Sequence, residues 1–513
     1  MRPWLYAPHL LAAGTGFLSL SEEILWVRLF GFANHSRPQA FAFVLAAYLL
    51  GIALGARYGQ RLTESPRPPW AMAGWVLLGS AALGLTTPWL FVLLVGLDDL
   101  LGTRLQVPLG GMLIILVAAS KALLFPLAHH LGSSTQPGRI GRSVSRVYLC
   151  NILGSALGPL VTGFLVLDAL STQQAFALSA GLTFAAGLLC LLPAMAPAFG
   201  AALATASIAL CAVPWLLDSQ ALVRLAAEPA GEIRKLVENR HGIITLYQGE
   251  SRGGEADDIV FGGNVYDGRT NLDPVANTNQ IHRLLVLPAL QPQPRRVLMI
   301  GLSIGSWLKL VTGFPGVETI DVIEINPGYL RAMEDYPRHL AALSDPRVRL
   351  YADDGRRWIN SHPEARYDLI VMNTTWHWRA YSNTLLAREF LSSLRQHLAP
   401  GGVVAWNTTG SPDALHTAST VFAHAYGFHS FAIAADFDWR PRLVTPAARD
   451  VLGSLTLDGQ PLFPRNSERT IRTYLNTAPV SVEQQARTAG RALQTITDRN
   501  LITEYRHGRS LWW

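Results

Sequence analysis

The chain has 513 residues, of which half are hydrophobic and only 15% are charged, and its mean hydropathy is +0.22. This composition is too apolar for an ordinary soluble enzyme and is typical of a membrane protein that carries a soluble part. The net charge of +6 does not indicate nucleic-acid binding, because the arginines cluster in short loops between apolar stretches, where membrane topology explains them. The cysteines (Cys150, Cys190 and Cys211) all lie in apolar segments, which excludes a disulfide framework or a CxxC metal site.

The first 217 residues contain apolar stretches long enough to cross a bilayer, which takes roughly 20 residues each. They lie near 5–31, 39–60, 69–96, 107–128, 144–167, 172–192 and 196–217. The first stretch lacks a small-x-small cleavage site, so we interpret it as a retained span and not as a removed signal peptide. We therefore predict a transmembrane helical bundle of six to eight spans over residues 1–217.

The charges of the loops predict the orientation of this bundle. Arginines follow the second and fourth predicted spans (Arg57, Arg61, Arg67, Arg139, Arg142 and Arg146), and aspartates lie in the loops between (Asp98, Asp99 and Asp168). The positive-inside rule places the arginine loops and the N-terminus in the cytoplasm. An even number of spans, which we favour, puts the C-terminal domain in the cytoplasm as well, whereas seven spans would leave it outside.

Some residues within the predicted spans are unusual for a membrane. Glu22 and Glu23 lie in the first span and Lys121 lies in the fourth. Insertion scales assign such residues about 2.5–3.5 kcal/mol each, so they usually form pairs or line a polar path. A structural ion pair and a path for a substrate or ion both remain open. Glycines repeat every four residues at 51–59 and 154–158, a spacing that lets helices pack closely.

The sequence changes character at about residue 220. Residues 218–290 predict a linker and a small β element, because "HGIITLYQGE" and "DDIVFGGNVYDG" have the pattern of short strands. In residues 291–435 apolar strands alternate with helices, which predicts a parallel sheet with helices on both faces. Residues 436–513 predict a helical or irregular extension.

Three strand ends of this second region indicate a nucleoside site. Gly301 and Gly305, in "VLMIGLSIGSW", follow the first strand, where the backbone must turn tightly and approach a ligand closely. Glu324 ends the second strand, where a carboxylate would reach the hydroxyls of a ribose. Asp353 and Asp354 end the third strand, where an acid can accept a hydrogen bond from an adenine amino group. The alternative is that Glu324 and Asp354 only cap the following helices.

Together with "NVYDG", "HRLLVLPAL", "DDGRRW", "YDLIV", "LLAREFL" and "HLAPGGVVAWN", these motifs resemble the spermidine synthase (polyamine aminopropyltransferase) family over residues 240–425. The segments "GFLSLSEEILWVRLF" and "AAYLLGIALGARYG" resemble its bacterial membrane-spanning members. The resemblance implies a transmembrane bundle followed by an α/β Rossmann-like domain of the S-adenosylmethionine-dependent methyltransferase type, with a small N-terminal β element. It also implies a multi-pass protein of a bacterial-type inner (plasma) membrane, and a donor that is S-adenosylmethionine or its decarboxylated form.

The sequence departs from the family where the family carries acids. The acid that takes the proton of the acceptor amine corresponds to Asn373, and the second acid of that pair corresponds to Trp376. Ile304 stands where the Gly-rich loop usually carries an acid for the donor's amino group. In the polyamine-holding stretch, Asn271 replaces a glutamine, and an acid pair is replaced by residues 276–277. Losing a general base typically lowers the rate 10²–10⁴-fold, so these departures favour an acceptor other than a polyamine.

The remaining catalytic candidates are Asp267, Asn373 and His377. Asp267 is the best remaining carboxylate for an acceptor amine, unless it only caps a turn. His377, in "DLIVMNTTWHW", is the one residue of that loop that can take a proton near pH 7; the alternative is an ordinary packed or surface histidine. Asn373 could bind a polar uncharged group or cap its strand.

The other site candidates are Asn271, which we assign to the cofactor site, and Tyr266, Trp376 and Trp378, which we assign to the substrate pocket. Aromatic faces can bind a sulfonium, with about 0.5–2 kcal/mol when desolvated. We predict no metal, because the histidines have no metal-ligand spacing with nearby acids or cysteines.

We predict a membrane-bound transferase that moves an alkyl group, preferentially aminopropyl, from an adenosyl sulfonium donor to an unidentified small-molecule or lipid-soluble acceptor. Two alternatives stay open. One is an S-adenosylmethionine-dependent methyltransferase, because Ile304 no longer selects the donor's amine end. The other is a transporter or sensor whose nucleoside domain regulates the bundle without chemistry. The expected partners are the lipid bilayer and, by resemblance, a second copy of the chain; we expect no nucleic acid.

Overall fold

The computed structural model describes residues 6–97, 103–133, 136, 138–191, 197–216, 218–252, 254–509 and 511. The chain forms two compact units. Unit 1 consists of Met1–Glu228, Glu238–Gly242 and Ser510–Trp513, and unit 2 of Pro229–Val237 and Ile243–Arg509. The divisions that the sequence suggested at residues 290 and 435 fall inside unit 2. Asp98 and Asp99 lie outside the described residues.

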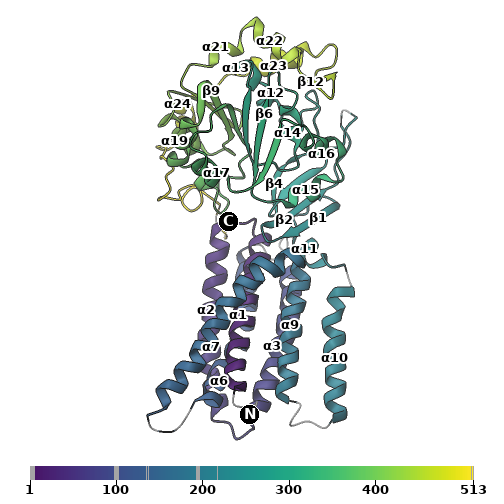
Figure 1. Cartoon of the computed structure of the whole chain (residues 1–513), viewed down its shortest axis with the longest axis vertical. Helices are drawn as coiled ribbons and strands as arrows, with labels where there is room; N and C mark the ends of the chain where they lie inside the picture. The colour runs from purple at the N-terminus through teal and green to yellow at the C-terminus, as the bar shows by residue number, and fades with distance from the viewer. Residues whose placement is uncertain are drawn as a thin grey trace. The chain divides into compact units, whose positions relative to one another are not determined.

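Unit 1 is built mainly from long helices (Figure 1). Six helical segments of the described residues are long and apolar enough to cross a membrane: Ala7–Ala33 (α1), Pro38–Thr63 (α2), Pro69–Gly96 (α3), Arg104–Gly132, Ile140–Ala169 and Thr172–Leu191 (α9). The fourth segment consists of α5 (Thr103–Ala122) and α6 (Leu124–Gly132). The fifth consists of α7 (Ile140–Val161), the π-helical turn η2 (Thr162–Val166) and α8 (Leu167–Ala169). Two helices follow, α10 (Pro197–Leu216) and α11 (Ala221–Ala226).

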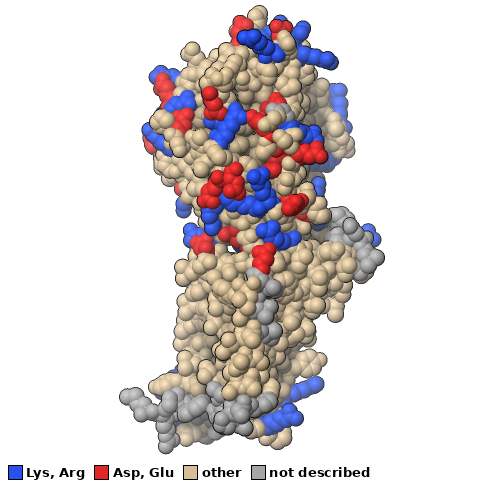
Figure 2. Space-filling model, turned by 90° about the vertical axis from the view of Figure 1, so that its right-hand side faces the viewer, with Lys and Arg blue, Asp and Glu red and all other residues tan. Residues whose placement is uncertain are grey.

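The outer faces of these helices stay apolar although no protein covers them. Only 17–56% of the most apolar stretch of each helix is buried within the protein. Large side chains such as Leu153 and Leu189 are 53% and 67% exposed, and the visible side of the bundle carries almost no charged residues between its ends (Figure 2). Apolar surface of this extent is stable against lipid and not against water. The six helices therefore indicate membrane insertion.

Glycines bring two pairs of these helices into backbone contact. A Cβ atom at Gly154 of α7 would lie 1.9 Å from the carbonyl oxygen of Ala13 in α1, and one at Gly55 of α2 would lie 2.2 Å from that of Ala119 in α5. No larger residue fits at either position. The close packing that the four-residue spacing predicted is confirmed.

The buried charges of the bundle form an ion pair. Glu22 and Lys121 are 1% and 3% exposed, and the Lys121 ammonium contacts Glu22 Oε2 and donates a hydrogen bond to Leu18 O at 3.3 Å. Nearby, the Tyr48 hydroxyl donates to Ser19 O at 2.6 Å. Removing either partner would leave an unpaired charge inside the bundle. Of the two alternatives for these residues, the contacts support the structural ion pair.

The chain leaves the helical bundle at the end opposite the arginine-rich loops. His35, in the turn between α1 and α2, contacts Glu228 at 2.9 Å, and Gln173 near the start of α9 donates to Asp218 O at 3.1 Å. The loop that follows α2, with Arg61 and Arg67, lies at the other end of the same 26-residue helix. The sequence predicted both the arginine loops and the C-terminal domain on the cytoplasmic side. In this helix order, with α10 returning along α9, the arginine loops and the chain exit lie at opposite ends of unit 1.

Unit 2 begins with a four-stranded sheet in the order β1-β2-β3-β4. Its strands are β1 (Ile233–Asn239), β2 (Gly242–Tyr247), β3 (Ile259–Gly262) and β4 (Val265–Arg269). The turn between β3 and β4 consists of Gly263 and Asn264, both with positive φ (59° and 64°), as a tight hairpin requires. This hairpin places Tyr266, Asp267 and Arg269 on one strand.

The main sheet of unit 2 has seven strands in the order β10-β11-β9-β8-β5-β6-β7. They are β5 (Arg296–Ile300), β6 (Thr319–Glu324), β7 (Val348–Ala352), β8 (Tyr367–Met372), β9 (Leu398–Asn407), β10 (His424–Phe428) and β11 (Phe431–Ala435). The pairs β5–β6, β6–β7, β5–β8 and β8–β9 are parallel, and β11 pairs antiparallel with β9 and β10. This is the predicted Rossmann-like sheet of the methyltransferase type.

Helices cover both faces of this sheet. They are α12 (His282–Leu285), α13 (Leu287–Leu290), α14 (Ser306–Val311), α15 (Gly328–Met333), α16 (Pro337–Leu343), α17 (Gly355–Ser361), α18 (Asn383–Leu386), α19 (Arg388–Gln396) and α20 (Pro412–Ser419). Alternate residues of β5 enter two separate cores: Val297 and Met299 one, Leu298 and Ile300 the other. Burial on both faces explains why the strands are continuous apolar runs.

The C-terminal extension packs against the rest of unit 2. It contains α21 (Arg440–Leu443), α22 (Pro446–Gly453), β12 (Thr456–Leu457), β13 (Gln460–Pro461), α23 (Glu468–Leu475) and α24 (Val482–Ala489). Arg491 pairs with the buried Asp413, and buried Glu504 accepts a hydrogen bond from the backbone of Asn383 at 3.0 Å. The extension therefore supports the segment that follows β8.

Candidate functional site

The strand order of the main sheet locates a candidate ligand site. From β5, the chain continues on one side through β6 and β7 and on the other through β8 and β9, so the carboxyl ends of β5 and β8 form a topological switch point. Asn373, directly after β8, donates its backbone N–H to Ile300 O at 2.8 Å. The Gly-rich turn after β5 and the loop after β8 therefore meet at this edge.

The two predicted glycines of the turn are required by its geometry. Gly301 and Gly305 have φ values of 92° and 81°, in the left-handed region. A Cβ atom at Gly301 would lie 2.7 Å from Asn373 O, and one at Gly305 would lie 2.6 Å from the Met333 methyl carbon. The turn can be this tight only without side chains at these positions.

Glu324 lies behind this turn and holds it. Its Oε2 accepts hydrogen bonds from the backbone of Leu302 (2.7 Å) and Ser303 (3.4 Å), and its Oε1 accepts one from Asn326 (2.7 Å). Burial raises the pKa of Glu324 to about 7, although these hydrogen bonds act in the opposite direction. The carboxyl group predicted to hold a ribose thus binds the backbone of the Gly-rich turn in this structure.

The acids after β7 make local contacts. Asp354 caps α17 by accepting from the backbone of Arg357 at 2.8 Å, which is the alternative role that the sequence left open. Asp353 forms an ion pair with the Arg357 side chain at 2.5 Å, and this contact lowers the pKa of Asp353. In the register of β6 and β7, Glu324 pairs with Ala352, so these acids lie at the same sheet edge as Glu324.

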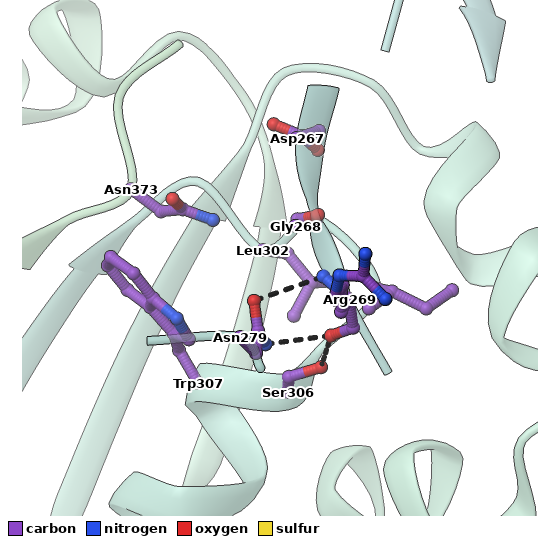
Figure 3. A pocket seen from close by; sticks show the side chains of 10 residues that line it. Asp267, Gly268, Arg269, Asn279, Leu302, Ser306, Trp307 and Asn373 are labelled. Carbon is purple, nitrogen blue, oxygen red and sulfur yellow. Dashed lines mark hydrogen bonds between the residues drawn. The ribbon is translucent and has the colours of Figure 1, made fainter. Parts of the chain in front are cut away.

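A small pocket opens in front of the turn (Figure 3). It is lined by Asp267, Gly268, Arg269, Asn279, Leu302, Ser303, Ile304, Ser306, Trp307 and Asn373. The structure thus brings two predicted residues, Asp267 and Asn373, together with the Gly-rich turn. Glu324, Asp353 and Asp354 are not among the lining residues.

Asp267 is the carboxylate of this pocket, and two residues that the sequence reasoning missed surround it. The Tyr329 hydroxyl, from α15, donates to Asp267 Oδ2 at 2.6 Å. A Cβ atom at Gly262 would lie 2.6 Å from that hydroxyl and 3.8 Å from both Arg379 Nη1 and Asp267 Cγ, so the three side chains meet at one point. Burial and the nearby charge of Asp267 raise the pKa of Tyr329.

Arg379 could have been noticed in the sequence, because it directly follows the Trp-His-Trp cluster of the loop after β8. Tyr329 gave no signal, since a tyrosine in the first turn of a helix is ordinary.

The wall of the pocket opposite Asn373 is fixed by hydrogen bonds to one residue. The Asn279 side chain accepts from Arg269 N at 3.0 Å and donates to Arg269 O at 2.7 Å, and the Ser306 hydroxyl donates to the same carbonyl at 2.7 Å (Figure 3). The Arg269 guanidinium pairs with the buried Asp257 at 2.9 Å. These contacts fasten the end of β4 to the start of α14.

The loop after β8 is anchored on several sides. The Trp376 indole N–H donates to Tyr266 O at 2.9 Å, and Trp378 is buried with its ring 6.1 Å from that of Trp376. His377 contacts Thr409 through Nδ1 at 3.0 Å, and burial lowers the pKa of His377 to about 4. A histidine with this pKa is neutral near pH 7 and a weak base, which favours the packed-histidine alternative.

Two other candidates have structural contacts. Asn271 is fully buried; it donates to Arg252 O at 2.9 Å and accepts from Asp273 N at 2.9 Å, so its amide serves the backbone. Tyr266 is half-buried, and burial raises its pKa while Arg269 and Arg283 act in the opposite direction. Neither residue lines the pocket. Within the described ranges, no group of three or more His, Cys, Asp or Glu residues could hold a metal ion.

Comparisons with known proteins agree with this architecture. Residues 282–436 match the family model described as a spermine/spermidine synthase domain. The C-terminal part of the chain therefore contains a spermine/spermidine synthase domain.

Two polyamine aminopropyltransferases illustrate the similarity. The protein from Alkalilimnicola ehrlichii is 37% identical over 97 residues, which is 18% of this chain and 34% of that protein. The protein from Mycobacterium tuberculosis is 25% identical over 409 residues, 78% of this chain and 76% of that protein. The chain thus spans about a third of the length of the first relative and three quarters of the second. The spermidine synthase structure from Thermotoga maritima is 16% identical with a TM-score of 0.34, covering 48% of this chain and 86% of that chain.

Proposed function

We propose that the C-terminal domain binds an adenosyl sulfonium donor at the Gly-rich turn and transfers an alkyl group, preferentially aminopropyl, to an acceptor amine. The family match and the names of the relatives support the reaction class. The observation that carries the proposal is Asp267, the single carboxylate among the described residues that line the pocket. Its Oδ2 is bound by Tyr329, and Oδ1 has no hydrogen-bond partner in the described part of the chain.

The chemistry requires this free oxygen. An amine must be neutral to attack the carbon beside the sulfonium, so its proton has to leave. The nitrogen–carbon bond forms as the carbon–sulfur bond breaks, the bonding pair stays on sulfur, and a thioether nucleoside departs. Asp267 Oδ1 accepts the proton of the amine, while Tyr329 holds the other oxygen in place. Asn373, from the opposite strand end, supplies a neutral hydrogen-bonding group.

The test measures turnover of the purified full chain in detergent with decarboxylated S-adenosylmethionine and a panel of amines. Asp267→Asn is expected to lower kcat about 10²–10⁴-fold while methylthioadenosine still binds. The exposed Asp450→Asn on α22 serves as the control. Full activity of Asp267→Asn would refute the assignment of the base.

Methyl transfer is the second candidate function, and Ile304 supports it. This residue is buried in the Gly-rich turn and lines the pocket, where the resemblance expects an acid for the donor's amino group. Without that acid the pocket does not favour the decarboxylated donor. Parallel assays with methyl-labelled and propyl-labelled donors distinguish the two reactions by which label the acceptor gains.

We further propose that unit 1 lies in a bacterial-type inner membrane and that the C-terminal domain faces the cytoplasm, where adenosyl sulfonium compounds are made. The helix order then places the arginine-rich loops outside, against the positive-inside rule. A lipid-soluble or small-molecule acceptor and a homodimer stay predictions.

A further inference from the structure

Among the described residues, the pocket is lined by one negative and one positive side chain from the same strand. Asp267 and Arg269 are the charged residues among its described lining. They are two residues apart on β4, where the register with β3 shifts at Asp267, and both side chains line the pocket. An ammonium and a carboxylate of one small molecule could be held between them.

Hydrogen-bond donors around Arg269 remain available for an anion. Arg269 Nη1 contacts the carboxylate and the carbonyl of Asp257, and the guanidinium also forms a side-chain hydrogen bond with Tyr266. The Asn279 amide uses one of its two N–H groups on Arg269 O. The Ser303 hydroxyl is buried in the wall of the pocket and has no hydrogen-bond partner within the described ranges. A buried polar group of this kind indicates a missing ligand or water.

A second cation lies close to the pocket, and no carboxylate of the described residues neutralises it. Arg283 is buried, and its partners are neutral: Ser430 Oγ, Asn407 Oδ1 at 3.5 Å and Gln280 O at 3.1 Å. Within the described part of the chain it has no carboxylate partner.

Arg283 packs 5.4 Å from the ring of Trp307, which lines the pocket. Burial lowers the pKa of Arg283 to about 10, which still leaves it charged at neutral pH. A polyamine would bring a second ammonium close to this charge with no second acid to bind it.

We propose that the pocket takes an amine that also carries a carboxylate, as at the end of an α-amino acid. The amine binds at Asp267, and the carboxylate binds Arg269, Ser303 and Asn279. This inference deepens the proposed function and rests on it. The carboxylate comes either with the acceptor or with the intact methionine end of the donor. In the first case the acceptor amine gives its proton to Asp267 and gains the alkyl group as the carbon–sulfur bond breaks. In the second case Asp267 holds the ammonium of the donor and does not act as the base, so only the adenosyl site of the proposed function is retained.

Ligand pairs that differ only by the carboxylate test the proposal on the full chain in detergent. The acceptor pair is ornithine and putrescine. The donor pair is S-adenosylhomocysteine and its decarboxylated counterpart. The carboxylated member of one pair is expected to bind at least about tenfold more tightly, as for a hydrogen bond to a charged group, and that pair identifies the source. Equal or weaker binding of the carboxylated member in both pairs would overturn the proposal.

Variants link the preference to the named residues. Arg269→Gln is expected to abolish the tenfold preference, and Arg395→Gln, at an exposed position on α19, is expected to retain it. Because Arg269 also pairs with Asp257, its variant could fail to fold; Arg283→Met is then expected to lower the preference at least about threefold. An unchanged preference in the folded variants would refute the assignment. Methylthioadenosine, which lacks the amino-acid end, is titrated alongside: if it does not bind, the proposed adenosyl site fails instead.

Discussion

Glu324 and Asp267 are both carboxylates near the Gly-rich turn, but the structure surrounds them differently. Glu324 is buried and accepts three backbone hydrogen bonds, which makes it part of the turn. Asp267 lines the pocket and is bonded by one hydroxyl group. The sequence placed Glu324 at the end of a strand, but its hydrogen-bond partners depend on how the next loop folds over it.

The raised pKa of Glu324 has a consequence for stability. Its pKa of about 7 in the folded chain lies above the usual 4.5, so between these values the folded state binds the proton more tightly than the unfolded state. The contribution of this group to stability is complete below about pH 4.5 and is lost as the pH rises to about 7. Between these limits the free energy of unfolding of wild type should fall relative to Glu324→Gln by up to about 3 kcal/mol. Urea unfolding at several pH values measures this, and parallel curves for the two proteins would contradict it.

At the scale of single elements, the turn after β5 shows that a local sequence pattern can be sufficient to predict which residues a turn requires. Its glycines were identified from their position between a strand and a helix, and the structure confirms the need for them. Gly301→Ala would introduce a strained φ and a contact of 2.7 Å with Asn373 O. We expect it to lower the free energy of unfolding by about 1–3 kcal/mol.

Gly453→Ala is the matched control for this change. Its Cβ would lie 4.0 Å from the Ile471 side chain, an ordinary contact at the end of α22. Chemical denaturation of both variants compares them directly, and equal stabilities would contradict the strain at Gly301.

Contacts between segments that are distant in the sequence could not be predicted from local patterns. The Trp376 indole donates to the carbonyl of Tyr266, which lies 110 residues earlier. The Asn279 side chain forms hydrogen bonds with both the backbone N–H and the carbonyl of Arg269, ten positions before it. No periodicity or spacing indicates such pairs. The parallel sheet with helices on both faces was predictable because each strand and helix has its own pattern. Membership of the pocket depends on β4, the loop with Asn279, the turn that leads into α14 and the loop after β8.

The buried pair of Glu22 and Lys121 can be tested at the same scale. Lys121→Met would leave Glu22 unpaired inside the bundle, so we expect a loss of about 3–5 kcal/mol. The double variant Glu22→Gln, Lys121→Met removes both charges and should recover most of that loss. Thermal unfolding in detergent measures the cycle. Additive losses in the double variant would show that the two residues do not act as a pair.

At the scale of the whole molecule, the chain combines a bundle with lipid-compatible faces and a Rossmann-like part that matches the spermine/spermidine synthase domain. The positive-inside rule and the need for a cytosolic donor assign opposite orientations to this arrangement, because the arginine loops and the chain exit lie at opposite ends of unit 1. We give priority to the donor. Alkaline phosphatase fused after Trp513 should therefore be inactive, and green fluorescent protein at the same place should fluoresce. Active phosphatase would place the domain outside the cytoplasm.

Binding of an adenosyl thioether is the most direct test of the account. Titration calorimetry of the full chain with methylthioadenosine should show saturable binding, and Glu324→Ala should abolish it, because the Gly-rich turn loses the group that accepts the N–H groups of Leu302 and Ser303. Absence of binding to wild type, or equal affinity in the folded Glu324→Ala variant, would contradict an adenosyl site at the carboxyl ends of β5 and β6.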